Sequence, residues 1–214
     1  DAVASYERAV QLRTKYARAL ASLADTLAIQ GRRAEAVKRY EAAISADPRV
    51  PETHNNLGAA LWRQGDVMRA ERELNEALRL RPGYAAAYFN LGHTALRDKR
   101  LADAAGHFRQ AASLKPDWVT ALTTAAWVMA TSPDGAARSP RDAVPLAERA
   151  AAMTARRDAV ALDVLAAAYA AAGRFDDAAA VAREAQRQAP ADLVADIGRR
   201  LSLYERREPF IDRR

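Results

Sequence analysis

The chain has 214 residues, of which 54 are Ala and only 7% are aromatic, so its core must be built mostly from small side chains. It contains no Cys, which excludes disulfides, thiolate metal sites, cysteine nucleophiles and covalently attached haem. Its net charge of +6 comes from 33 basic and 27 acidic residues that are mixed along the chain, as on a solvated helical surface, and we therefore expect no nucleic-acid partner.

No stretch reaches the roughly 20 apolar residues that a membrane-spanning helix requires. The longest run without a charged residue, 118–133, contains four Thr and ends at a Pro, and it is predicted to form a buried helix. We therefore expect no direct membrane insertion. The sequence does not indicate a compartment.

The first 16 residues match only half of a helical hairpin. Ala2, Tyr6 and Ala9 occupy positions typical of a second helix, whereas the corresponding first helix is missing. We expect residues 1–16 to be the second helix of a truncated repeat. Because a helical repeat with an uncovered apolar end is incomplete, the chain is expected to belong to a longer protein.

A repeat of 34 residues organises the next part of the chain. Pro48, Pro82 and Pro116 are spaced by 34 and each follows a helix-like apolar pattern. This spacing predicts three helical hairpins over residues 17–118, namely 17–50, 51–84 and 85–118.

Small residues recur at one position of the first helix and two of the second, where they allow close helix approach. The first-helix set is Ala24, Gly58, Gly92, Ala126 and Ala166. The second-helix sets are Ala36, Ala70, Ala104, Ala143 and Ala178, and Ala43, Ala77, Ala111, Ala150 and Ala185. Leu23, Leu57, Leu91 and Leu165, one place before the first-helix set, are expected to fill the same seam.

Glycine marks the turn inside most of these hairpins. Gly31, Gly65 and Gly173 fall where the first helix must end in a left-handed conformation. Lys99 occupies the same position in the third hairpin, so we expect that turn to be built differently.

The remaining chain continues the pattern with one irregular unit. Residues 119–158 form a repeat with a lengthened turn over 130–142, which contains two Ser-Pro pairs. A regular repeat follows at 159–192 and ends at Pro190. Residues 193–214 are predicted to be a capping helix with a tail, and Glu208-Pro209-Phe210 stops that helix.

These features together resemble the tetratricopeptide repeat family. The second full repeat matches the family pattern over Leu57-Gly58, Leu61, Gly65, Ala70, Leu74, Ala77 and Pro82. The resemblance implies an all-α fold, a right-handed α-solenoid of helix–turn–helix hairpins. The carboxyl-terminal part is similar to the repeats of bacterial members of the family and of appended repeat tails.

Signatures of catalysis are missing from the sequence. His54, His93 and His107 are too scattered to form a helical metal pair, and the glycines are not clustered into a phosphate loop. Ser132 and Ser139 have no His at a recognisable spacing. We expect no enzyme activity, no cofactor and no metal.

The resemblance implies that first helices line a concave groove. Asn56 and Asn90 are 34 residues apart and are similar to the asparagine ladder of O-linked N-acetylglucosamine transferases, which holds peptide backbones. Bonds from these amides to a neighbouring helix or to water are the alternative. Arg63 and Arg97 form a second pair that either grips carboxylates or closes a helix end.

Aromatic and polar side chains complete the predicted groove. Phe89 and Trp127 are candidate peptide anchors, and His93 and Thr124 occupy groove positions implied by the same resemblance. Trp62 is expected to pack between hairpins instead.

The predicted function is a non-catalytic scaffold that binds a protein or peptide, as an extended segment or a partner helix, in the concave groove. Two alternatives remain open. In the first, the chain is the repeat portion of a larger bacterial enzyme, such as a membrane glycosyltransferase. In the second, it is a structural subunit of a multiprotein assembly.

Overall fold

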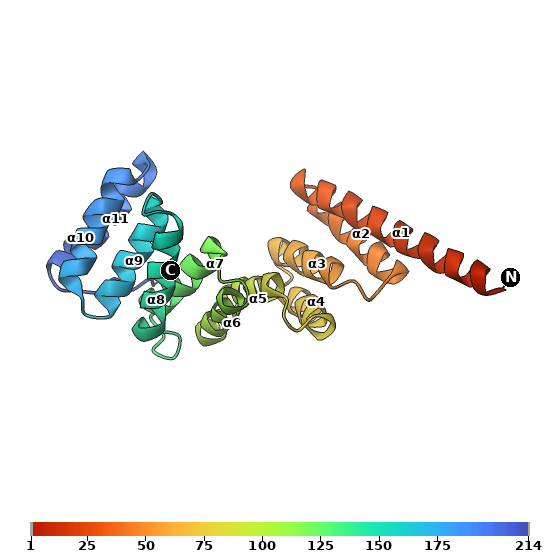
Figure 1. The fold of residues 1–214 in the computed structure, drawn as a ribbon, viewed down its shortest axis with the longest axis horizontal. Coiled ribbons are helices and arrows are strands. Elements are labelled where there is room, and N and C mark those ends of the chain that lie inside the picture. The colour runs from red at the N-terminus through yellow and green to blue at the C-terminus, as the bar shows by residue number, and fades with distance from the viewer. Residues whose placement is uncertain (1, 214) are drawn as a thin grey trace. The chain divides into compact units, whose positions relative to one another are not determined.

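The computed structural model describes the backbone of residues 2–213 and the side chains of residues 12, 13 and 15–213. Every regular element in this part of the chain is a helix (Figure 1), so the expected all-α repeat fold is confirmed. The helices are α1 (Ala2–Ile29), α2 (Arg33–Ala46), α3 (Pro51–Gln64), α4 (Val67–Leu80), α5 (Ala85–Arg97), α6 (Leu101–Leu114), α7 (Val119–Thr131), α8 (Pro140–Met153), α9 (Ala159–Ala171), α10 (Phe175–Gln188) and α11 (Ala191–Glu205).

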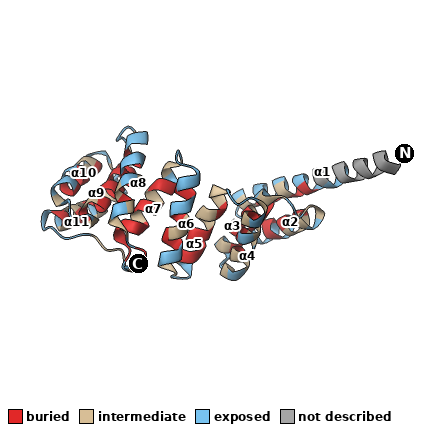
Figure 2. Ribbon diagram, turned by 60° about the horizontal axis from the view of Figure 1, so that its bottom comes forward, coloured by how far each residue is buried: buried red, intermediate tan, exposed pale blue. Residues whose placement is uncertain are grey.

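The chain divides into two compact units, Asp1–Asp98 and Lys99–Arg214. In the first unit, α1 packs on α2 and α3 packs on both α4 and α5. In the second unit, α7–α8 and α9–α10 form hairpins, α6 packs on α7, and α11 packs on α10. Most helices carry a buried side and an exposed side (Figure 2), as expected for amphipathic helices that pack in layers.

The small residues at the repeat positions lie in the seams between helices, as predicted. The first of the two second-helix sets has no exposed surface at all: Ala36, Ala70, Ala104, Ala143 and Ala178. In α3 the contact is closer still, because a Cβ added to Gly58 would lie 2.7 Å from Cγ of Leu74. The Ala-rich composition is therefore explained by helix pairs that approach too closely for larger side chains.

Helix α1 differs from expectation in two respects. It runs without interruption from residue 2 to residue 29, so no helix boundary exists at residue 17. The physical reason is that no Gly or Pro occurs in this stretch. The side chains of Ala2, Tyr6 and Ala9, which suggested a truncated repeat, lie outside the described residues.

Leu23 is also not a seam residue. It is 44% exposed, whereas the buried side of α1 runs through Ala17, Leu20, Ala24 and Leu27. These four positions recur at helical spacing and define the side that faces α2 and α3, and Leu23 falls beside that side. The corresponding Leu57, Leu91 and Leu165 are at most 3% exposed, as predicted.

The turns use the left-handed backbone that glycine favours. Gly31, Gly65 and Gly173 have φ values of 77°, 93° and 78°. Lys99 has φ 57°, so the third turn keeps the left-handed conformation without glycine, contrary to the expectation of a different turn. A non-glycine residue tolerates this region at a steric cost that the neighbouring helices must offset.

The long connection between α7 and α8 is anchored to the second unit. The Ser139 N–H donates to the carbonyl of Met129 at 2.9 Å. Ala137, inside the loop, is only 2% exposed. The extra residues therefore pack against α7 and hold the start of α8 close to the end of α7.

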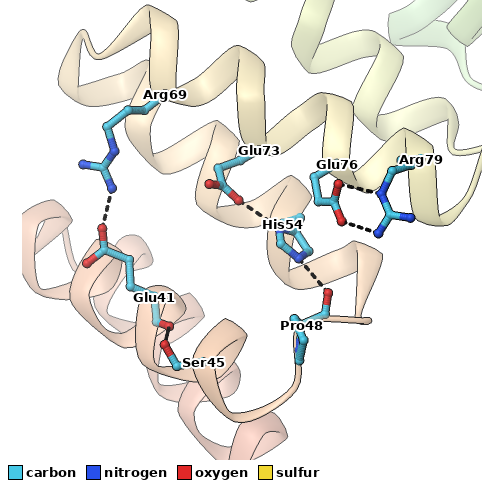
Figure 3. Close-up of polar contacts among 8 residues, drawn as sticks. All are labelled: Glu41, Ser45, Pro48, His54, Arg69, Glu73, Glu76 and Arg79. Carbon is cyan, nitrogen blue, oxygen red and sulfur yellow. Dashed lines mark hydrogen bonds and ion pairs between the residues drawn. The ribbon is translucent and has the colours of Figure 1, made fainter.

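Polar contacts brace α2, α3 and α4 (Figure 3). The ring of His54 is buried, with Nδ1 2.8 Å from Oε2 of Glu73 and Nε2 2.9 Å from the carbonyl oxygen of Pro48. Both partners are acceptors, so the protonated ring satisfies both by donating twice. Burial lowers the pKa of His54, but these two hydrogen bonds outweigh it and leave the pKa above its ordinary value. Arg69 of α4 also pairs with Glu41 of α2.

Candidate functional site: the groove of the first unit

A groove of about 530 Å³ opens between the helices of the first unit. Its apolar lining includes two small side chains of α3, Ala59 and Ala60. Its polar lining comes from α1, α2, α3 and α5 and consists of Asp25, Arg33, Tyr40, Asn55, Asn56, Arg63 and Asn90. Two of the predicted peptide-contacting residues, Asn56 and Asn90, thus line one groove, together with the predicted Arg63.

The amides in this groove form a continuous hydrogen-bonded chain. Nδ2 of Asn90 donates to Oδ1 of Asn55 at 2.9 Å. Nδ2 of Asn55 donates to Oδ1 of Asn56 at 3.0 Å, and Nδ2 of Asn56 donates to Oδ1 of Asp25 at 3.0 Å. The side chains of three helices, α5, α3 and α1, are therefore held in fixed orientations before any ligand arrives.

Tyr40 ends the chain on the side of α2. Its hydroxyl donates to Oδ1 of Asp25 at 2.5 Å. Burial, and then the bond to Asp25, raise the pKa of Tyr40 above its ordinary value, so the hydroxyl remains a donor at neutral pH. The carboxylate of Asp25 on α1 thus accepts hydrogen bonds from Tyr40 on α2 and from Asn56 on α3.

Sequence reasoning placed Asn56 and Asn90 in equivalent positions but missed how they are connected. They do not bond to each other; Asn55 lies between them, and Asp25 and Tyr40 extend the chain. The one signal of this hydrogen-bonded chain in the sequence was the pair Asn55-Asn56, because two adjacent amides can bond to side chains on two neighbouring helices.

Arg33 and Arg63 supply positive charge at the margin of the groove. Both residues are exposed, and Arg63 donates to the carbonyl of Ala59 at 3.3 Å. Among the side chains that the structure describes, no carboxylate forms an ion pair with either of them. Their charge is available to a bound molecule.

Arg97, in contrast, is used within the protein. Its NH1 donates to the carbonyl of Trp62 at 2.6 Å, and its guanidinium lies 5.9 Å from the centroid of the Trp62 ring. Trp62 lies in the last turn of α3, so Arg97 closes the carboxyl end of that helix. The contacts of Arg97 therefore match the alternative interpretation, in which it closes a helix end. The helix that it closes is α3 of the preceding hairpin, and not its own helix, α5.

Phe89 and His93 form an aromatic cluster with Trp62 beside this contact. The Phe89 and His93 rings meet edge-on at 4.8 Å, and the Trp62 indole N–H donates to the carbonyl of His93 at 3.2 Å. Trp62 packs between α3 and α5, as predicted. Burial and the nearby charge of Arg63 lower the pKa of His93, so this ring is neutral at pH 7.

The last two predicted site residues, Thr124 and Trp127, belong to the second unit. Thr124 is half-buried on α7. The face of Trp127 is not open, because the ring of Phe210 lies 5.7 Å from it and its indole N–H donates to Oδ2 of Asp212 at 3.3 Å. The predicted anchor is in contact with a later segment of its own chain.

Among the described residues, no group of three or more metal-binding side chains comes together. Over the same residues, no helix combines the length and the apolar character that crossing a bilayer demands.

Comparisons with known proteins agree on the fold. A family model described as "TPR repeat" matches residues 24–65, and one described as "Tetratricopeptide repeat" matches residues 55–117. No curated protein matches the chain.

Several solved structures share its fold. A thermophilic TPR protein of Thermus thermophilus, TTC0263, is 22% identical with a TM-score of 0.58, and the match covers 88% of this chain and 98% of that protein. MamA of Desulfovibrio magneticus is 17% identical with a TM-score of 0.64, over 86% and 96% of the two chains. The first TPR domain of RPAP3, solved with the HSP90 peptide SRMEEVD, is 24% identical with a TM-score of 0.52, over 54% and 91%. Residues 24–117 therefore match the tetratricopeptide repeat family, and the solved TPR structures share the fold over a larger part of the chain.

Proposed function

We propose that this protein is a non-catalytic interaction scaffold and that the groove of its first unit holds an extended segment of a partner protein. The observation that carries the proposal is the hydrogen-bonded chain from Asn90 to Asp25 along that groove. A lining that is ordered in advance lowers the entropy lost on binding.

The unused hydrogen-bonding capacity of the amides suits a polypeptide backbone. Each Nδ2 group has two protons and uses one in the chain, and Oδ1 of Asn90 accepts no bond from the described residues. Because all three residues line the groove, these remaining donors and this acceptor can pair with a ligand there. An extended segment presents N–H and C=O groups in alternation and can pair with both.

The margin of the groove favours acidic side chains. Arg33 and Arg63 have no carboxylate partner among the described residues, and the planar guanidinium of each suits bidentate contact with one. The peptide SRMEEVD in the RPAP3 structure is rich in such groups, and by analogy with that fold we extend the preference to this chain.

Selection from a library of random linear peptides tests this function. The selected peptides are then titrated against wild type, N56A/N90A and R63A by fluorescence anisotropy. We expect acidic linear peptides whose affinity falls at least about tenfold in N56A/N90A and R63A, since central contacts dominate binding. Asn75 and Arg72 are exposed on α4 and provide matched controls, N75A and R72A. Equal affinity for all five proteins would exclude the groove as the binding surface.

A structural subunit of an assembly is the second candidate, because α1 exposes an apolar surface. Leu12, Tyr16 and Leu23 are 55%, 62% and 44% exposed. Light scattering of the native protein measures whether this surface is covered by other subunits. In that case Y16D lowers the particle mass, whereas M68D, at an apolar residue that is 82% exposed on α4, leaves it unchanged.

A further inference from the structure

Residues 208–213 follow α11, have no regular secondary structure and return to the end of α7. The turn that releases them uses Arg207 at φ 61° and a bond from the Glu208 N–H to the carbonyl of Leu203 at 3.0 Å. At the far end, the Asp212 N–H donates to the carbonyl of Thr131 at 2.8 Å. The segment thus lies against the second unit as a bound peptide does.

The surface beneath the segment is fixed by contacts that do not involve the segment. Arg200 of α11 is buried and holds the carboxylate of Asp163 on α9 through two hydrogen bonds, Nε to Oδ1 at 2.9 Å and NH2 to Oδ2 at 2.6 Å. The same guanidinium lies 5.4 Å from the centroid of the Trp127 ring on α7. A cation and an aromatic plane are therefore held side by side by three helices.

Two side chains of the segment contact this surface. Phe210 lies 5.5 Å from the Arg200 guanidinium, and Asp212 accepts from the Trp127 indole. Glu208, in contrast, pairs with its near neighbour Arg206, with Oε1 3.3 Å from Nε. The contacts with the surface therefore define a pattern of an aromatic and an acidic residue separated by one position.

The segment is less buried than the core of the unit. Residues 206–209 are exposed, and residues 210–212 are only half-buried. The last fully buried apolar residue of the chain is Tyr204, which precedes the segment. Beside Phe210, a cavity of about 630 Å³ lined by Arg199, Leu203 and Arg206 leaves room for a larger side chain.

We propose that Thr131, Trp127 and Arg200 form a second peptide-recognition site, specific for an aromatic-x-acidic segment of a partner protein and closed in this chain by residues 208–213. A tethered segment acts at an effective concentration in the millimolar range, so it excludes partners that bind weakly and yields to those that bind tightly. This site is independent of the groove in the first unit.

A labelled peptide with the sequence of residues 207–213 tests the proposal in the full chain. In F210A/D212A the site is open, and we expect fluorescence anisotropy to give at least about tenfold tighter binding than in wild type or in R213A, a control at an exposed residue of the same segment. A peptide in which Ala replaces the aromatic residue must fail to bind. In ¹⁵N spectra, the indole signal of Trp127 must shift on titration, whereas those of Trp62 and Trp118 must not.

Three results would overturn the proposal. The first is equal affinity of the peptide for F210A/D212A and wild type. The second is a lower melting temperature of F210A/D212A without any peptide binding, because the segment would then be a structural cap only. The third is unchanged binding of the peptide in which Ala replaces the aromatic residue, because this result would contradict the stated specificity.

Discussion

The guanidinium of Arg200 and the carboxylate of Asp163 form a two-bond ion pair that is 9% and 12% exposed at the side chains, and it joins α11 to α9. Burial raises the pKa of Asp163, although Arg200 opposes the shift. A buried pair of this kind contributes little net stability over an apolar pair, but removing one partner leaves a charge in a place that cannot solvate it.

We therefore expect D163N to lower the free energy of unfolding by about 3–5 kcal/mol, as measured by urea denaturation. The control is D177N, which breaks an exposed contact with Arg174 at 2.9 Å and should leave the denaturation midpoint nearly unchanged. Similar midpoints for D163N and wild type would show that water reaches Arg200.

Two glycines in helices should respond oppositely to the same substitution. In G58A the new methyl group would lie 2.7 Å from Cγ of Leu74, and we expect a loss of about 1–3 kcal/mol from overpacking. At Gly106 in α6, a Cβ meets no atom within 4 Å, so G106A should gain about 0.5–1 kcal/mol from helix propensity. Thermal denaturation followed by circular dichroism measures both. A stabilised G58A would mean that α3 and α4 can move apart at no cost.

The contact between His54 and Glu73 should make stability depend on pH. The pKa of His54 is raised in the folded protein, so folding favours the protonated ring. The stabilisation is fully present below the ordinary value of about 6.5 and is lost as the pH rises through the folded pKa. The difference in unfolding free energy between wild type and E73Q should therefore shrink from mildly acidic to mildly alkaline pH.

His93 makes the comparison with E73Q necessary. Its pKa is lowered in the folded protein, so its contribution has the opposite sign and is lost as the pH falls. The pH profile of wild type alone contains both effects, whereas the difference from E73Q isolates that of His54. Parallel profiles for the two proteins over this range would contradict the assignment.

Arg97 is expected to matter for stability and not for ligand charge. In R97A the carbonyl of Trp62 loses a hydrogen bond of 2.6 Å, and we expect a loss of about 1 kcal/mol together with a change in tryptophan fluorescence. R72A on the exposed side of α4 is the control. If R97A instead weakens binding of acidic peptides at unchanged stability, Arg97 belongs with Arg63 in the groove.

The sequence was sufficient for the repeat architecture because that architecture depends on local, periodic features. The spacing of Pro48, Pro82 and Pro116 and the left-handed turns at glycine are set within single hairpins. Lys99 shows the limit of such reasoning, because its backbone lies in the left-handed region, at φ 57°, although its side chain disfavours that region.

The candidate sites were harder to predict because they depend on contacts over long sequence separations. Tyr40 and Asp25 are 15 residues apart, and Trp127 and Asp212 are 85 residues apart. The family pattern correctly placed Asn56 and Asn90 on neighbouring helices, but it contained no information on the chain of bonds between them or on the segment that covers Trp127.

The direction of the bonds in the first groove has a consequence for how a ligand is oriented. Every amide from Asn90 to Asn56 donates toward the negative charge of Asp25. Donation toward an anion makes the oxygen of the same amide a stronger acceptor, so the polarisation passes along the chain to Oδ1 of Asn90. For a peptide bound as we propose, the α5 end of the groove should therefore favour a hydrogen-bond donor, such as a backbone N–H, opposite Oδ1 of Asn90.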